Sequence, residues 1–183
     1  MSLTQNQQDA LNAVATQLKI PAIWLSNVIQ KESGWNPLAV GKIPYNQYAL
    51  NKGTETIPHY AKGLIQFIDS TARKLGYNDS QDLIDQHPSI EDQLVYPVYN
   101  YFLREAPFTD ENDFYLSVFY PTYRHKPLDT IVSASVQAAN PKIKTVGDYI
   151  NYIKGVVSTD KFYLMGIAAL LICGAYIISK FLK

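Results

Sequence analysis

Residues 21–33 of the chain are PAIWLSNVIQKES. Proline is favoured in a first helical turn, and Gly34 and Pro37 follow as stop signals, so the stretch predicts a helix. Leu25, Val28 and Ile29 have the spacing of one apolar helix face, and Glu32 falls on that same face, seven residues after Leu25. A carboxyl group there is desolvated, so its pKa rises toward the range that a general acid near neutral pH requires. Taken alone, the pattern also fits a helix-end glutamate that turns toward water.

Further helices are predicted on both sides of this one. Thr4 and Gln7 form a capping box that begins a helix ending at Leu18. The remaining helical patterns cover residues 70–75, 80–86, 89–104 and 112–120, with a last helix beginning at Thr145 and Asp148. Pro97 predicts a kink or break within 89–104. Residues 35–60 and 121–144 lack a sustained period and predict loops, and long ordered loops tend to be functional. Strand signals are weak, so the fold class is mainly α, as a single domain.

Charge and composition exclude several classes of protein. All 16 acidic residues but only 13 of the 16 basic residues precede Lys161, so this part has a net charge of −3. Such a domain is a poor partner for nucleic acid, which needs clustered cations. Cys173 is the only cysteine, and the three histidines show no metal-ligand spacing. We therefore expect no disulfide, no metal site and no cofactor.

The C-terminal region predicts a membrane anchor. Residues 162–179 contain no charged side chain, and a helix of this length spans roughly 27 Å, close to the thickness of a hydrocarbon core. Lysines flank both ends, so charge does not set the orientation. The expected division is a catalytic domain, 1–157, followed by a linker and transmembrane helix, 158–183. The N-terminus has no basic start and no apolar run, and we expect no signal peptide there.

Two short blocks carry a family resemblance. Lys31-Glu32-Ser33-Gly34-Trp35-Asn36-Pro37 is followed, after the loop, by Gly63-Leu64-Ile65-Gln66-Phe67. In this order and spacing they resemble the lytic transglycosylases and goose-type lysozymes, over roughly residues 10–123. Ile65 replaces the family's usual methionine. A third segment, Tyr115-Leu116-Ser117-Val118-Phe119-Tyr120-Pro121, departs from the family's Ala-Tyr-Asn type and looks more like transglycosylase domains of phage virion proteins.

The resemblance implies a lysozyme-like fold and a site that cuts the glycan strands of peptidoglycan. It implies that Glu32 is the catalytic acid, and the matched positions imply substrate-binding roles for Ser33, Gly63, Gln66, Phe67 and Tyr120. Ser33 is expected to hold the substrate's N-acetyl group or the Glu32 carboxylate, and Tyr120 to orient Glu32 or bind sugar. Gly63 would allow close approach of the backbone to the glycan. Several other tyrosines near loops and helix ends suit either sugar binding or ordinary packing.

The sequence leaves the reaction type open. Glycosidases usually need two carboxylates, and no second one stands in a convincing motif; Glu55 and Asp69 are the nearest candidates. The family resemblance implies a one-acid route that closes a 1,6-anhydro ring on MurNAc, whereas hydrolysis by a muramidase of the same fold is the alternative. A non-catalytic glycan-binding or structural virion protein, or a holin-like membrane protein, would leave the two blocks unexplained.

The expected setting follows from the phage-like segment together with the apolar tail. We expect the protein in a virion's internal membrane, with capsid or membrane proteins of the virion as partners and local wall opening at genome entry as its role. A bacterial inner membrane is the alternative location.

Overall fold

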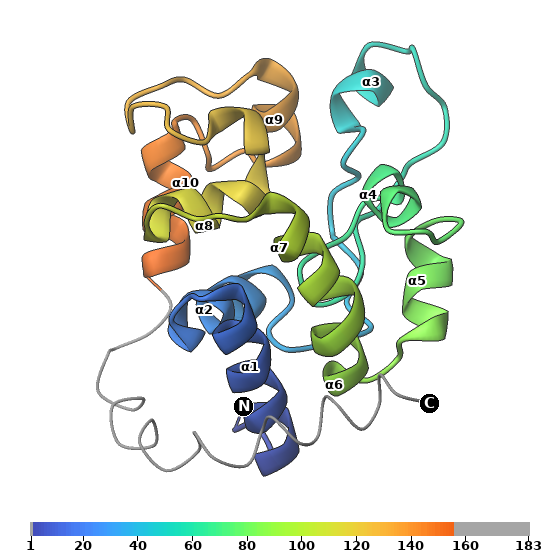
Figure 1. The fold of residues 1–183 in the computed structure, drawn as a ribbon. Coiled ribbons are helices and arrows are strands. Elements are labelled where there is room, and N and C mark those ends of the chain that lie inside the picture. Colours follow the sequence, from blue (N-terminus) through green and yellow to red (C-terminus); the bar gives the residue numbers. More distant parts are fainter. Residues whose placement is uncertain (1, 156–183) are drawn as a thin grey trace.

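The two N-terminal helices begin and end where the sequence predicts. The structure, a computed structural model, describes residues 2–155 (Figure 1). In α1 (Gln5–Leu18) the Thr4 hydroxyl accepts a hydrogen bond from the Gln7 backbone and the Gln7 side chain accepts one from Thr4, which confirms the capping box. The second helix, α2 (Ala22–Glu32), has Pro21 as its N-cap and ends at Glu32.

The predicted break at Pro97 is confirmed, and its form is a π-helical turn. Ser89 caps α6 (Ile90–Gln93), the turn η1 (Leu94–Val98) follows, and α7 (Tyr99–Glu105) completes the segment. Proline has no N–H to donate and its ring crowds the preceding turn, so the helix widens around Pro97 and then continues.

Four further helices lie near their predicted positions, and two short ones occur where loops were predicted. The predicted ones are α4 (Asp69–Lys74), α5 (Ser80–Gln86), α8 (Glu111–Phe119) and α10 (Val146–Lys154). The loop predictions for 35–60 and 121–144 were wrong in part, because α3 (Gln47–Asn51) lies in the first, and the 3₁₀ turn η2 (Pro121–Tyr123) and α9 (Ala134–Ala139) lie in the second. α3 and η2 span five and three residues, too few for an apolar period to repeat, and Val136 is the one large apolar residue of α9.

Helix α2 occupies the middle of the bundle. Its buried side chains include Leu25, Val28 and Ile29, each with 0% exposure, and it contacts α1, α8 and α10. On the neighbouring side, the Phe102 and Phe114 rings stack with centroids 4.5 Å apart and join α7 to α8. The end of α2 that carries Glu32 is therefore held from several directions, which fixes its position.

Backbone pairing outside the helices is limited to isolated bridges in the described part of the chain. Lys62 pairs with Val40 and with Phe67, and Ile131 pairs with Thr145. The Lys62–Phe67 pair closes a tight hairpin, with backbone hydrogen bonds of 2.9 and 2.7 Å, around the Gly-Leu-Ile-Gln block.

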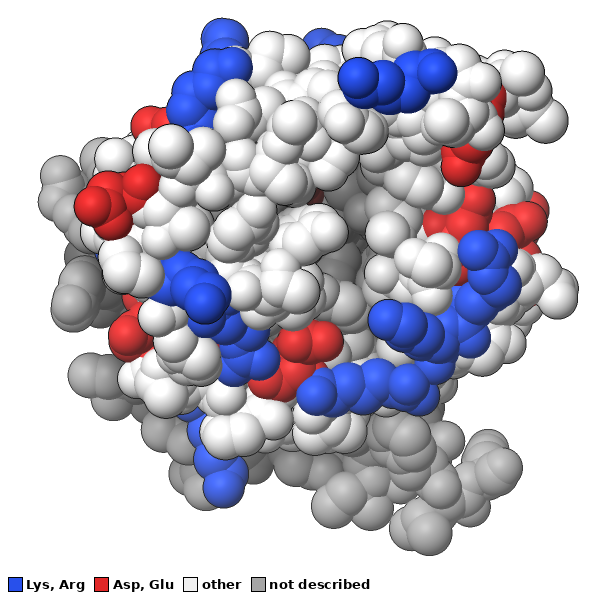
Figure 2. All heavy atoms as spheres, turned by 90° about the horizontal axis from the view of Figure 1, so that it is seen from above, with Lys and Arg blue, Asp and Glu red and all other residues white. Residues whose placement is uncertain are grey.

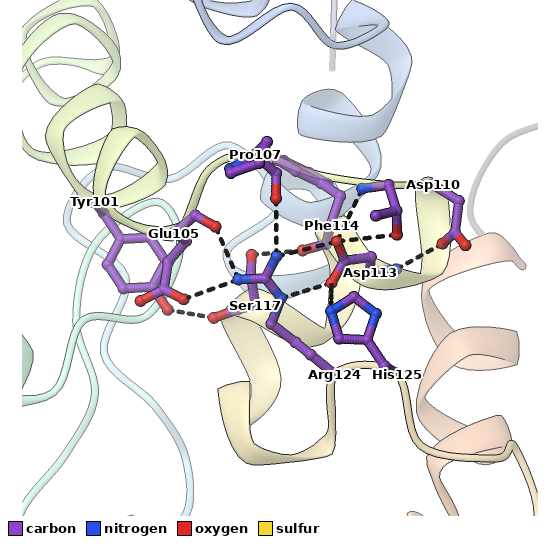
Figure 3. A network of polar contacts seen from close by, with 10 residues as sticks. Tyr101, Glu105, Pro107, Asp110, Asp113, Phe114, Ser117, Arg124 and His125 are labelled. Atoms are coloured by element: carbon purple, nitrogen blue, oxygen red, sulfur yellow. Dashed lines mark hydrogen bonds and ion pairs between the residues drawn. The ribbon is translucent and has the colours of Figure 1, made fainter.

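A buried ion pair fastens the segment after α8 to the end of α7 (Figure 3). The Arg124 guanidinium donates to both carboxylate oxygens of Asp113, at 2.6 and 3.0 Å, and to the backbone oxygens of Glu105 and Pro107. These hydrogen bonds from Arg124 lower the pKa of Asp113 to about 2. The network thus fixes residues 120–124, of which Tyr120 and Pro121 border the cleft described below.

Among residues 2–155, no helix has the length and apolarity needed to cross a membrane. The predicted spanning segment, 162–179, and the whole of the predicted second region, 158–183, lie outside the described residues.

Candidate active site

A cleft of about 1070 Å³ lies above the C-terminal end of α2. One wall consists of residues from 41–45 and 61–75, and the other of residues from 118–121, 140–143 and α10, with the end of α7 between them. Figure 2 looks into the hollow between these walls. The two long segments that join the main helices, 35–60 and 121–144, both contribute to the cleft.

Glu32 lies at the floor of this cleft. It is the last residue of α2, it is partly buried, and its carboxyl group borders the cleft next to Lys31. The apolar face formed by Leu25, Val28 and Ile29 directs it inward, as the spacing predicts. Burial removes water from the carboxylate and raises its pKa to about 7.

Tyr149 is the hydrogen-bond partner of Glu32. Its hydroxyl donates to Glu32 Oε1 at 3.1 Å, which favours the charged form of Glu32 and partly offsets the effect of burial on its pKa. The Tyr149 ring is 3% exposed and stacks on Phe119, with ring centroids 4.1 Å apart. Burial and the neighbouring Glu32 raise the pKa of Tyr149 well above 10, so its hydroxyl stays protonated and remains a donor.

Sequence reasoning did not select Tyr149. The sequence predicts its helix, but no motif in the sequence marks Tyr149 as a residue of the site. Only the contact of α10 with α2, across 117 positions of sequence, shows that the hydroxyl reaches Glu32. The Thr145–Asp148 capping box predicts where α10 begins, but it does not show which elements α10 contacts.

Gln66 and Phe67 both border the cleft, on the wall that carries the hairpin. Gln66 has a φ of 57°, a backbone conformation that costs a non-glycine residue about 1 kcal/mol or more. Its side-chain amide donates to the Gly63 carbonyl at 3.0 Å. Phe67 is 2% exposed and its ring lies nearly perpendicular to that of Tyr101, so little of Phe67 is accessible from the cleft.

Gly63 and Ser33 lie near the site but are not among the residues that border the cleft. Gly63 has a φ of 80°, and a Cβ atom there would come within 2.8 Å of the Gln93 side chain. Its close contact is thus with Gln93, which also accepts from the Leu64 N–H and donates to the Pro37 carbonyl. The Ser33 hydroxyl donates to the Ile29 carbonyl at 3.1 Å, within its own helix end.

Tyr120 borders the cleft, is 42% exposed and packs against Tyr123 with centroids 5.3 Å apart. No hydrogen bond joins it to Glu32 within the part of the chain that the structure describes. Its exposed ring leaves it free to contact a sugar. Tyr45, Tyr101 and Tyr152 border the same cleft.

The second carboxylates suggested by the sequence are engaged elsewhere. Asp69 accepts hydrogen bonds from Ser80 and Tyr45, and Glu55 from Asn46, and neither borders the cleft. The other carboxylate that does border it is Glu105, which lies 3.4 Å from the Arg124 guanidinium. Among residues 2–155, no group of histidine, cysteine and acidic side chains is placed to hold a metal ion.

Comparisons with known proteins agree with this geometry. Residues 9–92, which include Glu32 and the Gly-Leu-Ile-Gln block, match the model of the Transglycosylase SLT domain family. No curated protein and no solved structure matches the chain significantly. Residues 9–92 are therefore similar to the SLT transglycosylase domain, which supports the resemblance to the lytic transglycosylases and lysozyme-like proteins.

Proposed function

We propose that the protein cleaves the β-1,4 bond between MurNAc and GlcNAc in peptidoglycan, with Glu32 as its one catalytic acid. The match to the SLT transglycosylase domain supports peptidoglycan as the substrate and glycan cleavage as the reaction. The observation that carries the assignment is the state of Glu32. It borders the cleft, forms no salt bridge among residues 2–155, and has a pKa of about 7.

A pKa near 7 suits both halves of a one-acid reaction. Protonated Glu32 donates its proton to the glycosidic oxygen as the bond to C1 of MurNAc breaks, and the substrate's N-acetyl group stabilises the positive centre. The Glu32 carboxylate then removes the proton of the C6 hydroxyl. The C6 oxygen attacks C1 and closes a 1,6-anhydro ring, so Glu32 regains its proton and no water is consumed.

The surroundings of Glu32 favour this route over hydrolysis. Most hydrolytic glycosidases use a second carboxylate, roughly 5 to 9.5 Å from the acid, as nucleophile or base. Glu105, the other carboxylate of the cleft, is already beside Arg124, and no further carboxylate borders the cleft among residues 2–155. Tyr149 would then be a positioning residue that orients Glu32, and Gln66, Phe67 and Tyr120 the residues that contact sugar. Ser33 and Gly63 would act indirectly, by shaping the backbone beside them.

Mass spectrometry of the soluble products tests the reaction type. We expect muropeptides released from purified walls to end in 1,6-anhydro-MurNAc. Products that all carry reducing ends, each heavier by one water molecule, would identify a muramidase of the same fold and would require a second catalytic group.

We further propose that residues 162–179 anchor this domain in a membrane. The segment has no charge over 18 residues and is bounded by Lys161 and Lys180, which suits a helix that spans a hydrocarbon core. The phage-like segment ending at Pro121 favours a virion membrane over a bacterial inner membrane, and a role in opening the wall locally for genome entry.

Flotation of the full chain with lipid vesicles tests the anchor. The protein should float with the vesicles, and the double substitution Leu170→Arg, Leu171→Arg should abolish flotation, because each arginine is costly in a hydrocarbon core. Leu103→Arg is the matched control, because Leu103 is 50% exposed on the surface of α7. Equal flotation of all three proteins would exclude the anchor, and absence of the protein from purified lipid-containing particles would exclude the entry role.

A further inference from the structure

The cationic side chains of the domain are concentrated at the cleft. The described chain is acidic overall, yet the residues bordering the cleft comprise five basic and only two acidic ones. The basic residues are Lys31, Lys42, Lys74, Arg104 and Lys142. Figure 2 shows lysine and arginine side chains gathered along the rim of the hollow.

These cations come from separate elements and both walls. Lys42 and Lys74 lie on the wall formed by residues 41–75, Lys142 lies on the opposite wall, and Arg104 lies at the end of α7. All four are exposed, and none forms a salt bridge with a residue between 2 and 155. The fifth, Lys31, has its ammonium group 4.3 Å from the centre of the Tyr152 ring, beside Glu32.

The acidic residues of the cleft do not balance this charge. Glu105 is beside Arg124, and Glu32 is held by Tyr149 in a desolvated position where its charged form is disfavoured. The cleft therefore has a net positive potential, and its walls concentrate that field. Such a potential attracts an anionic ligand, whereas a neutral ligand is not attracted by it.

The sugar rings of a glycan strand are neutral, whereas its stem peptides are not. A stem peptide is linked to the lactyl group of each MurNAc and carries free carboxylates, so anionic groups flank the bond that is to be cut. We infer that the rim formed by Lys42, Lys74, Arg104 and Lys142 binds stem-peptide carboxylates, so that the cleft selects peptide-bearing strands over bare ones. This inference rests on the proposed function, because it takes the strand cut at Glu32 to be peptidoglycan.

Binding measured with the Glu32→Gln protein tests the inference without requiring turnover. Three ligands of equal glycan length are compared: strands with free stem peptides, the same strands with their carboxylates converted to amides, and strands stripped of peptide. We expect the first to bind about tenfold more tightly than the other two, from several exposed charge pairs that each contribute modestly. The difference should shrink as salt is added.

The triple substitution Lys42→Ala, Lys74→Ala, Lys142→Ala should remove most of this preference. The matched control is Lys126→Ala, Lys144→Ala, because both lysines are exposed and neither borders the cleft. Equal binding of free and amidated strands would overturn the inference, and so would an unchanged preference in the triple variant. Cell walls that retain their phosphate polymers give a further comparison: if the protein prefers only these walls, the ligand of the rim is phosphate and the inference is wrong. If carboxylate-dependent binding occurs but the unmutated protein cuts no strand, the proposed function fails and the rim assignment survives.

Discussion

At the scale of single residues, Glu32 is governed by two opposed effects. Burial disfavours its charged form, and the hydrogen bond from Tyr149 favours it; burial dominates, so the pKa stands at about 7. A fully exposed carboxyl would already be ionised at neutral pH and could not donate a proton. A carboxyl held by several donors would be a weak base after the first step.

Replacing Tyr149 with phenylalanine should move the pH dependence in a defined direction. Without the donated hydrogen bond the charged form of Glu32 loses stabilisation, so its pKa rises further. The basic limb of the pH–rate profile should shift upward by roughly half a unit to one unit. Tyr120→Phe is the control, since Tyr120 borders the same cleft without a hydrogen bond to Glu32. A shift in the Tyr120 variant and none in the Tyr149 variant would reverse the two assignments.

Gly63 shows how a motif residue can have a different neighbour from the one expected. The sequence predicts a glycine that allows glycan to approach. The structure places the buried Gln93 side chain against it, at a backbone φ of 80° that favours glycine in any case. Gln93 in turn accepts a hydrogen bond from the Leu64 N–H of the hairpin and donates one to the Pro37 carbonyl. Gly63 therefore supports the cleft wall through its contact with Gln93 and not by bordering the cleft.

Among the secondary-structure elements, capping residues and prolines predicted accurately where helices begin or break. Thr4, Pro21 and Ser89 each precede a helix that begins where predicted, and Pro97 marks the π-helical turn. Local chemistry decides these features, so they can be predicted from short stretches of sequence. The short helix α3 has no side-chain cap and contacts α9, which is far from it in the sequence, so no local pattern shows it.

At the scale of the whole molecule, the floor of the site could be predicted and its walls could not. The acid and the Gln66 hairpin lie in two blocks with recognisable composition. Tyr149, Glu105 and the cations of the rim come from segments with no shared motif, and they meet only because α10 packs on α2 and residues 140–143 cover one wall. Net charge alone indicated a mildly acidic domain and gave no sign that its cations gather at the cleft.

In the proposed reaction Glu32 acts alone as the acid, and substitution of this residue tests that role. The measurement is the rate at which purified, folded protein clears a suspension of cell walls, comparing Glu32→Gln with Glu105→Gln, the same change in the other carboxylate of the cleft. The amide in Glu32→Gln cannot donate a proton, so we expect the rate to fall by about 10²–10⁴-fold, whereas Glu105→Gln should stay close to the unmutated protein. Near-normal clearing by folded Glu32→Gln, or equal losses in both variants, would contradict the account.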